Sequence, residues 1–168
     1  MPHNLLKVYN QLLDVMAYSP EQRLLSLRSI FNRDIANNSD FSFRKKKLNP
    51  TTADGEDTMD RLFRHLTTVI TDKATNKREF DLSRSIRLHW IKYHVEEKKD
   101  ENMFVFSVQE REGIRTYIYD KDEQYVIVLE PMRKKDEYYL LTAYYLTGKD
   151  KARDKMQKKY ERRIEAIL

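Results

Sequence analysis

Arg87, His89 and His94 lie close together in the segment DLSRSIRLHWIKYHVEEK (residues 81–98), where they could carry out acid–base chemistry on a phosphate. In a helix, Arg87 and His94 are seven residues apart and lie on nearly the same line. Histidine suits proton transfer because its ordinary pKa is about 6.5, and arginine can hold a phosphate in a bidentate manner. We expect His94 to be a general acid or base and Arg87 a phosphate clamp, with His89 and Lys92 as the substitute pair. A packed, hydrogen-bonded role is the alternative for either histidine.

A second arginine lies in IRTYIYD (residues 114–120), where it alternates with tyrosines. Side chains alternate along a strand, so Arg115, Tyr117 and Tyr119 share one face. Such a face suits RNA, because Arg115 can clamp a phosphate and each base stacked on a ring contributes about 1–3 kcal/mol. The alternative is an arginine whose aliphatic part lies across an exposed sheet face.

The stretch YYLLTAYYL (residues 138–146) places hydroxyl groups among leucines. In a regular strand, Thr142 and Tyr144 share a face with Tyr138, Leu140 and Leu146. Hydroxyl groups in such a place are either packed and hydrogen-bonded or line a cleft. We expect Thr142 and Tyr144 to orient or contact a substrate; simple packing of the tyrosines is the alternative.

The remaining histidines and glutamates are weaker candidates for a catalytic role. His3 is expected to be idle, and His65 lies beside the apolar stripe of its predicted helix, where a packed histidine is expected. Glu130 and Glu137 could act as bases, but their spacing does not single them out. The chain has no cysteine, which excludes disulfides and thiolate catalysis, and it contains no Gly-rich phosphate loop, HExxH or Ser/His/Asp signature. We expect neither a cofactor nor a metal.

The charge distribution favours a polyanionic partner. The net charge is +5, and basic residues concentrate in FRKKKL (residues 43–48) and in the tail 149–168. Lys45 and Lys46 of the first run are expected to contact RNA; solvated surface is the alternative for both stretches. The sequence shows no signal peptide and no apolar run long enough to span a membrane. We expect a cytoplasmic protein with no membrane partner.

The elements that must position these residues differ between two predicted regions. Residues 1–76 are predicted to form a helical N-terminal segment with a basic loop. Its predicted elements are helices over 4–18, 20–37 and 58–70, a loop over 41–57, and a polar linker over 71–79. The apolar stripe of the first helix consists of Leu5, Val8, Leu12, Val15 and Met16.

Residues 77–168 are predicted to form an α+β domain. A central helix over 81–98 packs on a four-stranded antiparallel sheet, and a basic helix over 148–168 closes the chain. The strands are predicted over 102–109, 114–120, 124–130 and 137–146, because hydrophobicity there has a period of two and hairpin-length connections separate the runs.

This order of a helix followed by a four-stranded antiparallel sheet is similar to that of a known protein group. The stretch 84–146, with RSIRLHWIKYH, RTYIYD, YVIVLE and YYLLTAYYL, resembles the ribonuclease group of barnase, EndoU, colicin D and RelE, which occur in phages and toxins. The resemblance implies a metal-independent endoribonuclease that cleaves tRNA or mRNA through attack by the RNA 2′-hydroxyl, with a cognate inhibitor protein as a further partner. It also implies that Thr142 and Tyr144 match the Ser/Thr-x-Tyr pair at the end of that group's sheet.

Two other functions remain open at this point. A non-catalytic RNA-binding module would bind RNA in a salt-dependent manner without cleaving it. A protein-interaction module would use the two N-terminal helices and would have no affinity for RNA.

Overall fold

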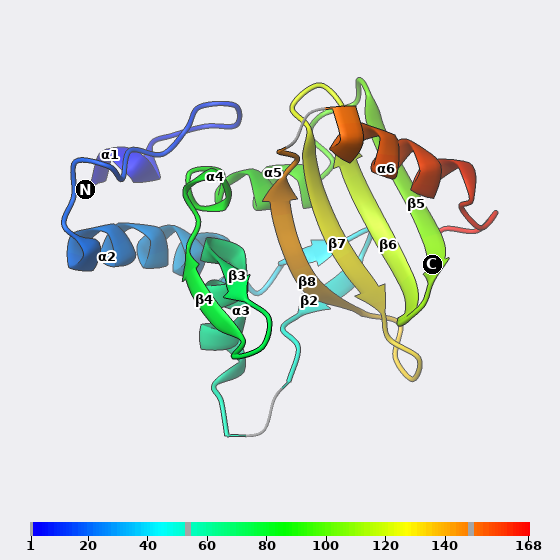
Figure 1. Ribbon diagram of the computed structural model, residues 1–168, viewed down its shortest axis with the longest axis horizontal. Helices are drawn as coiled ribbons and strands as arrows, with labels where there is room; N and C mark the ends of the chain where they lie inside the picture. Colours follow the sequence, from blue (N-terminus) through cyan, green and yellow to red (C-terminus); the bar gives the residue numbers. More distant parts are fainter. Residues whose placement is uncertain (1, 53–54, 148–149) are drawn as a thin grey trace.

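The computed structural model describes residues 2–52, 55–147 and 150–168, which form a mixed α+β fold (Figure 1). The main sheet has the strand order β1-β2-β8-β7-β6-β5, and β3 and β4 form a separate small sheet. The strands are β1 (Ser42–Phe43), β2 (Lys46–Asn49), β3 (Thr68–Asp72), β4 (Lys77–Phe80), β5 (Met103–Glu110), β6 (Gly113–Asp120), β7 (Tyr125–Pro131) and β8 (Tyr138–Tyr145). The helices are α1 (Pro2–Leu5), α2 (Pro20–Phe31), α3 (Thr58–Thr67), α4 (Leu82–Ser85), α5 (Trp90–Val95) and α6 (Asp150–Glu161), with a π-helical turn η1 (Asn32–Ala36) after α2.

The predicted antiparallel meander is confirmed as β5 to β8. Each strand pairs with its neighbour in sequence, and each lies within about one residue of its predicted bounds. The prediction of only four strands is wrong. β2 adds to β8 in parallel through Leu48 and Tyr138, and β1 pairs with β2. Both short strands lie in the predicted loop 41–57. The basic run between Phe43 and Leu48 favoured a loop in the sequence, but both of these side chains are buried.

One irregularity in β8 decides which way its side chains point. The register shifts between Val128 and Leu129: Leu129 pairs with Leu140, whereas Val128 pairs with Thr142. Leu141 is therefore the extra residue of a β-bulge, and a bulge exchanges the faces of the residues that follow it. Leu140 packs with one hydrophobic cluster, and Tyr144 packs with the other.

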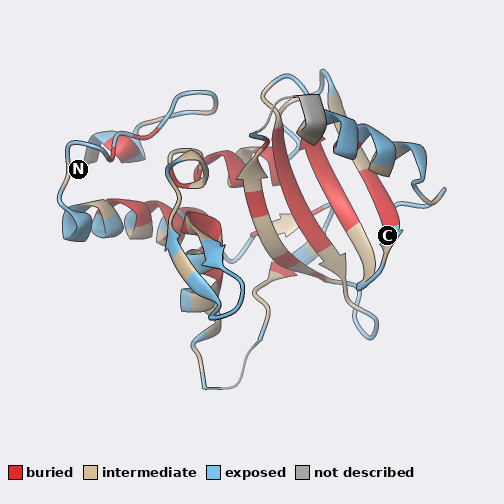
Figure 2. Ribbon diagram, in the orientation of Figure 1, coloured by how far each residue is buried: buried red, intermediate tan, exposed pale blue. Residues whose placement is uncertain are grey.

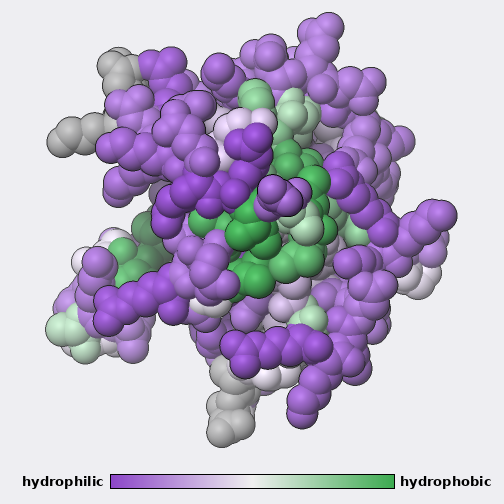
Figure 3. Space-filling model, turned by 90° about the vertical axis from the view of Figure 1, so that its right-hand side faces the viewer, coloured by the Kyte–Doolittle hydropathy of each residue, from purple (hydrophilic) through white to green (hydrophobic). Residues whose placement is uncertain are grey.

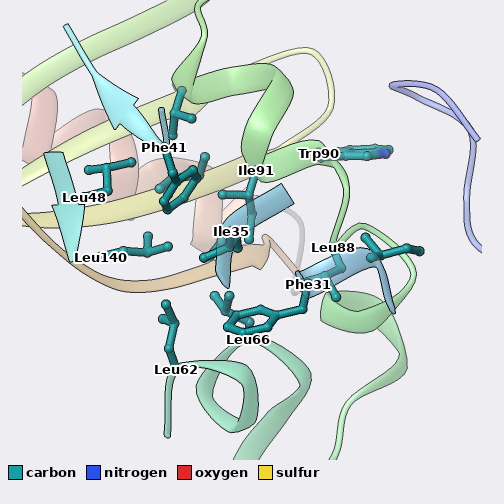
Figure 4. Close-up of a cluster of buried hydrophobic side chains, with 14 of the residues drawn as sticks. Phe31, Ile35, Phe41, Leu48, Leu62, Leu66, Leu88, Trp90, Ile91 and Leu140 are labelled. Atoms are coloured by element: carbon teal, nitrogen blue, oxygen red, sulfur yellow. The ribbon is translucent and has the colours of Figure 1, made fainter. Parts of the chain in front are cut away.

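The two faces of the meander pack against different helices (Figure 1). On the first, the α5 face, Tyr125, Ile127 and Leu129 join the larger core, whose side chains from α2, α3 and α5 are drawn in Figure 4. On the second, the α6 face, Val126 and Val128 pack in a smaller core beneath α6. Burial therefore concentrates in the central strands β6 and β7, as Figure 2 shows.

The predicted helix over 4–18 is wrong, because only Pro2–Leu5 is helical and the following residues form turns. The Asn4 side chain donates to the carbonyl of Asp14 (2.8 Å) and accepts from its amide (2.9 Å). A straight helix would separate these residues by about 15 Å, so this contact requires the segment to fold back. Of the predicted stripe only Val15 is buried, together with Leu13, which lies outside the stripe.

The predicted helix over 81–98 is also divided. Asp81 caps α4 by accepting from the amide of Arg84 (3.0 Å), but a tighter turn with i→i+3 hydrogen bonds joins α4 to α5. In a regular helix Trp90 would point away from Leu88 and Ile91, yet all three side chains are buried in the core. The turn brings them to the same side.

The helix predicted over 58–70 begins after Asp57, which caps it by accepting from the amide of Asp60 (3.0 Å), and ends at Thr67. Four β-branched residues at this point (67–70) favour a strand, and β3 pairs with β4 where a linker was predicted. The boundary predicted between residues 76 and 77 falls at the start of β4, within this hairpin. The larger core contains residues from both sides of that boundary.

The C-terminal basic helix is shorter than predicted. It ends at Glu161, and residues 162–168 cross to β5, where the Ile164 amide donates to the Ser107 carbonyl (2.9 Å). Figure 3 shows this side of the molecule, with hydrophobic residues gathered in the middle and hydrophilic residues around them. In the described part of the chain, no helix is long and apolar enough to cross a membrane.

Candidate functional site

His94, the predicted acid or base, lies in the core and not at a surface. Its side chain is 1% exposed. Nδ1 lies 2.7 Å from the Trp90 carbonyl and Nε2 lies 2.8 Å from Oδ2 of Asp120. Both ring nitrogens are thus occupied by protein groups, and the ring does not reach solvent. The structure corrects the expected role: His94 holds α5 to the end of β6.

Asp120 is the centre of this buried network. The carboxylate accepts from Tyr9, from Lys99 (2.6 Å) and from the amide of Glu123 (3.2 Å), in addition to His94. Burial alone would raise the pKa of Asp120, but the hydrogen bonds from His94, Lys99 and Tyr9 outweigh burial and hold that pKa far below its ordinary range. The ionised carboxylate therefore ties the N-terminal segment and α5 to the sheet.

Thr142 and Tyr144 lie on the other face of the sheet from His94, because the bulge at Leu141 turns them toward the α6 face. There they meet an arginine that was not among the predicted site residues. Arg84 donates from Nη1 to Oγ1 of Thr142 (2.9 Å) and to the carbonyl of His65 (2.9 Å). Its guanidinium carbon also lies 5.7 Å from the ring centre of Tyr144.

Arg84 belongs to a group of basic side chains that we call the arginine cluster: Arg61, Arg64 and His65 of α3, Arg78 of β4, and Arg84 of α4. The cluster is held together by the contacts of α3 and α4 with β8 and by the β3–β4 hairpin. Arg78 donates to Oγ1 of Thr68 (2.8 Å) and to its carbonyl (2.9 Å). Burial lowers the pKa of Arg78, and the positive charges of Arg84, Arg64 and Arg61 lower it further.

In the described part of the chain, two carboxylates lie near the four arginines of this cluster. Glu56 pairs with both Arg61 and Arg64, and Asp81 lies 3.9 Å from Arg84. Among the described residues, Arg78 has no carboxylate partner. Arg84 is only 19% exposed and is fixed by neutral acceptors, whereas Arg64 is 43% exposed. The cluster is thus a rigid surface with an excess of positive charge.

His65 lies within the arginine cluster, although the sequence predicted a packed histidine. Burial lowers the pKa of His65 to about 4, with a further contribution from the positive charges of Arg78, Arg61 and Arg64. The imidazole is therefore neutral at pH 7. The spacing of Arg61, Arg64 and His65 on one helical face was the signal that could have located this group.

The other predicted site residues do not join the cluster or one another. Arg87 packs 3.9 Å from the ring centre of Tyr145 and donates to the Ser83 carbonyl. Arg115 is 16% exposed and lies 3.5 Å from Glu130. Their described contacts are therefore with protein groups.

The predicted base-stacking and substrate-contacting residues are mostly covered. Tyr117 and Tyr119 are buried in the smaller core, and His89 is buried with Nε2 near the Val8 carbonyl (3.1 Å). Lys92 pairs with Glu96 on α5, and Lys46 pairs with Asp136. Lys45 is exposed at the β1–β2 turn.

A hollow of about 920 Å³ lies between the β5–β6 turn and the β7–β8 loop, away from the arginine cluster. It is lined by basic and acidic side chains in equal number: Lys46, Arg133, Lys134, Lys135, Glu112, Glu130, Asp136 and Glu137. The balance of charge gives no preference for an anion there. The arginine cluster is the stronger candidate site.

Comparisons with known proteins identify no relative. No family model, curated protein or solved structure matches the chain. The candidate function therefore depends on the site itself.

Proposed function

We propose that this chain binds RNA through the arginine cluster. The observation that carries the proposal is the meeting of Arg61, Arg64, Arg78 and Arg84 beside β8, where Glu56 and Asp81 are the counter-charges found among the described residues. Guanidinium groups bind phosphate oxygens in a bidentate manner, and several of them on rigid elements can follow a phosphate backbone.

The environment of each arginine supports a phosphate ligand. Arg78 and Arg84 donate to neutral oxygens of Thr68, Thr142 and the His65 backbone, so their charges are not neutralised by these contacts. A bound phosphate would supply the missing negative charge. Tyr144, beside Arg84, provides a half-buried ring that a base could contact.

Binding of a labelled single-stranded RNA, followed by fluorescence anisotropy over a salt series, tests the proposal. We expect Arg78→Gln to weaken binding about tenfold and to reduce the slope of log affinity against log salt by about 0.7, the value for one phosphate contact on a single strand. The matched control is Arg133→Gln, which removes the same charge from the exposed β7–β8 loop. Equal losses of RNA affinity in the two variants would show general electrostatic attraction to the basic protein and not binding at the arginine cluster.

A metal-independent endoribonuclease at the same place is the second candidate, and the observation that favours it is the neutral His65 among arginines. A neutral imidazole can accept the proton of the RNA 2′-hydroxyl. The 2′-oxygen would bond to phosphorus as the bond to the 5′-oxygen breaks, giving a 2′,3′-cyclic phosphate and, after protonation of the leaving oxygen, a 5′-hydroxyl. The guanidinium groups would stabilise the charge that grows on the phosphate.

Incubation of total RNA with the protein in EDTA separates the two candidates. Cleavage by wild type that falls about 10²–10⁴-fold in His65→Gln supports the enzyme, with His3→Gln as the matched control at an exposed position. Binding without cleavage leaves the RNA-binding proposal standing alone. Cleavage that persists in His65→Gln would exclude His65 as the base.

A further inference from the structure

The N-terminal segment has its apolar side chains on the outside. Seven large apolar residues between positions 5 and 25 are exposed, among them Leu6 at 79% and Met16 at 69%. We call this set the apolar N-terminal surface: Leu5, Leu6, Val8, Leu12, Met16, Leu24 and Leu25. Figure 2 shows the loop after α1 and the outer side of α2 as exposed.

Polar contacts fix this segment to the rest of the molecule. Tyr9 donates to the buried carboxylate of Asp120, and the indole nitrogen of Trp90 donates to the Gln11 carbonyl (3.1 Å). The Leu13 amide donates to the carbonyl of Ile86 (3.0 Å). The backbone that carries the exposed side chains is therefore anchored at several points, and the apolar groups are presented in a defined arrangement.

The exposed residues come from segments that hydrogen bonds bring together. The Asn4 side chain reaches both Ser26 Oγ (2.8 Å) and the backbone of Asp14. Leu5 and Leu25 directly adjoin these bonded residues in sequence, and α1 lies alongside the first half of α2 (Figure 1). The exposed residues thus come from chain segments that lie next to one another.

The size of this surface matches a protein interface. From their exposed fractions, the seven side chains offer on the order of 600 Å² of apolar surface, at the upper end of the largest patch found on typical monomers. A standard interface buries about 800 Å² on each partner. A modest rim around the surface is enough to reach that area.

The charges around this surface favour a second copy of the chain. Residues 2–25 contain Lys7 and Arg23 against Asp14 and Glu21, and Lys7 lies 3.4 Å from Asp14. The net charge of +5 is therefore carried by the rest of the chain. Arg33 donates to the Leu5 carbonyl (2.7 Å) at the edge of this surface and is paired with Asp34. Two copies can therefore meet there without a net repulsion between their charges.

We propose that the apolar N-terminal surface is the interface of a twofold-symmetric homodimer. In such an interface the same patch is used by both copies, so the contact closes and does not continue into a filament. The proposal is independent of RNA binding. It would also place two arginine clusters in one particle.

Sedimentation velocity over a wide range of protein concentration tests the dimer. We expect wild type to dimerise and Leu6→Gln/Leu25→Gln to be monomeric under the same conditions, with a dissociation constant at least tenfold higher for each leucine removed from the interface. Both side chains are mostly exposed, so circular dichroism should be unchanged. The matched control is Ile167→Gln, because Ile167 is a 43% exposed apolar residue of the C-terminal segment.

Cross-linking gives a second measurement, because the natural chain has no cysteine. Under oxidation, Leu6→Cys, Met16→Cys and Leu25→Cys should include at least one variant that forms a covalent dimer at low concentration, whereas Ile167→Cys should not. A monomeric wild type at every concentration overturns the proposal. So does a dimer that survives Leu6→Gln/Leu25→Gln or is lost in Ile167→Gln, and so does binding to neutral phosphatidylcholine vesicles in place of self-association.

Discussion

Replacing Asp120 with asparagine should remove much of the stability of the fold. The carboxylate is fully buried and accepts hydrogen bonds from Tyr9, His94 and Lys99. In Asp120→Asn, the amide group brings its own hydrogens into a site filled with donors, and Lys99 loses its buried counter-charge. Removing one partner of a buried pair costs about 3–5 kcal/mol. That is a large part of the total stability of a small domain, about 5–15 kcal/mol.

Urea unfolding followed by Trp90 fluorescence measures this loss. Trp90 is the only tryptophan, is buried, and donates to the N-terminal segment, so its emission reports on the region that Asp120 holds. The control is Asp122→Asn, because Asp122 also contacts Lys99 (3.0 Å) but is 48% exposed. We expect that variant to lose much less stability than Asp120→Asn, because solvent screens an exposed pair. A loss below about 1 kcal/mol in Asp120→Asn would refute the assignment of Asp120 as the centre of the network.

The same carboxylate predicts how stability depends on pH. The pKa of Asp120 is lower in the folded protein than its unfolded value of about 3.9, so the folded state gains stability from its ionised form above that value. This contribution is complete above about pH 5 and is lost as the pH falls below 4 toward the folded pKa. Urea midpoints measured from pH 6 down to pH 3 should therefore fall more steeply for wild type than for Asp120→Asn. Parallel curves would contradict the role of this carboxylate.

Two further predictions concern the basic turn and α6. Arg44 and Lys45 form a two-residue turn with φ of 51° and 69°, so Lys45→Gly should be about 0.5–1 kcal/mol more stable than Lys45→Ala in thermal unfolding; equal melting temperatures would count against strain at this position. Glu110 accepts from Tyr117 (2.8 Å) and Lys159, linking β5 and β6 to α6, so Glu110→Gln should increase hydrogen exchange in α6 while leaving β7 protected. Unchanged exchange in α6 would show that its apolar contacts alone hold it.

The parts of the fold that the sequence predicted well are those governed by local pattern. The strands of the meander follow the alternation of apolar and polar residues, and the helix predicted to begin at residue 20 does begin there, with Ser19 as its cap. The failures arise from contacts between distant residues. Asn4 binds the backbone of Asp14 and prevents the helix that the stripe around it predicted.

The candidate site also depends on contacts between distant residues that local sequence pattern does not reveal. Counting residues along β8 assigns Thr142 to the face of Leu140, which is the face that His94 approaches. The bulge adds one residue at Leu141, and Thr142 instead meets Arg84 on the opposite face. A bulge depends on the pairing of two strands, and β8 contains no glycine or proline that would indicate one. The bulge therefore could not be predicted from the sequence of β8. One unpaired residue thus separates the predicted site around His94 from the arginine cluster, and it makes His65, not His94, the histidine beside Thr142.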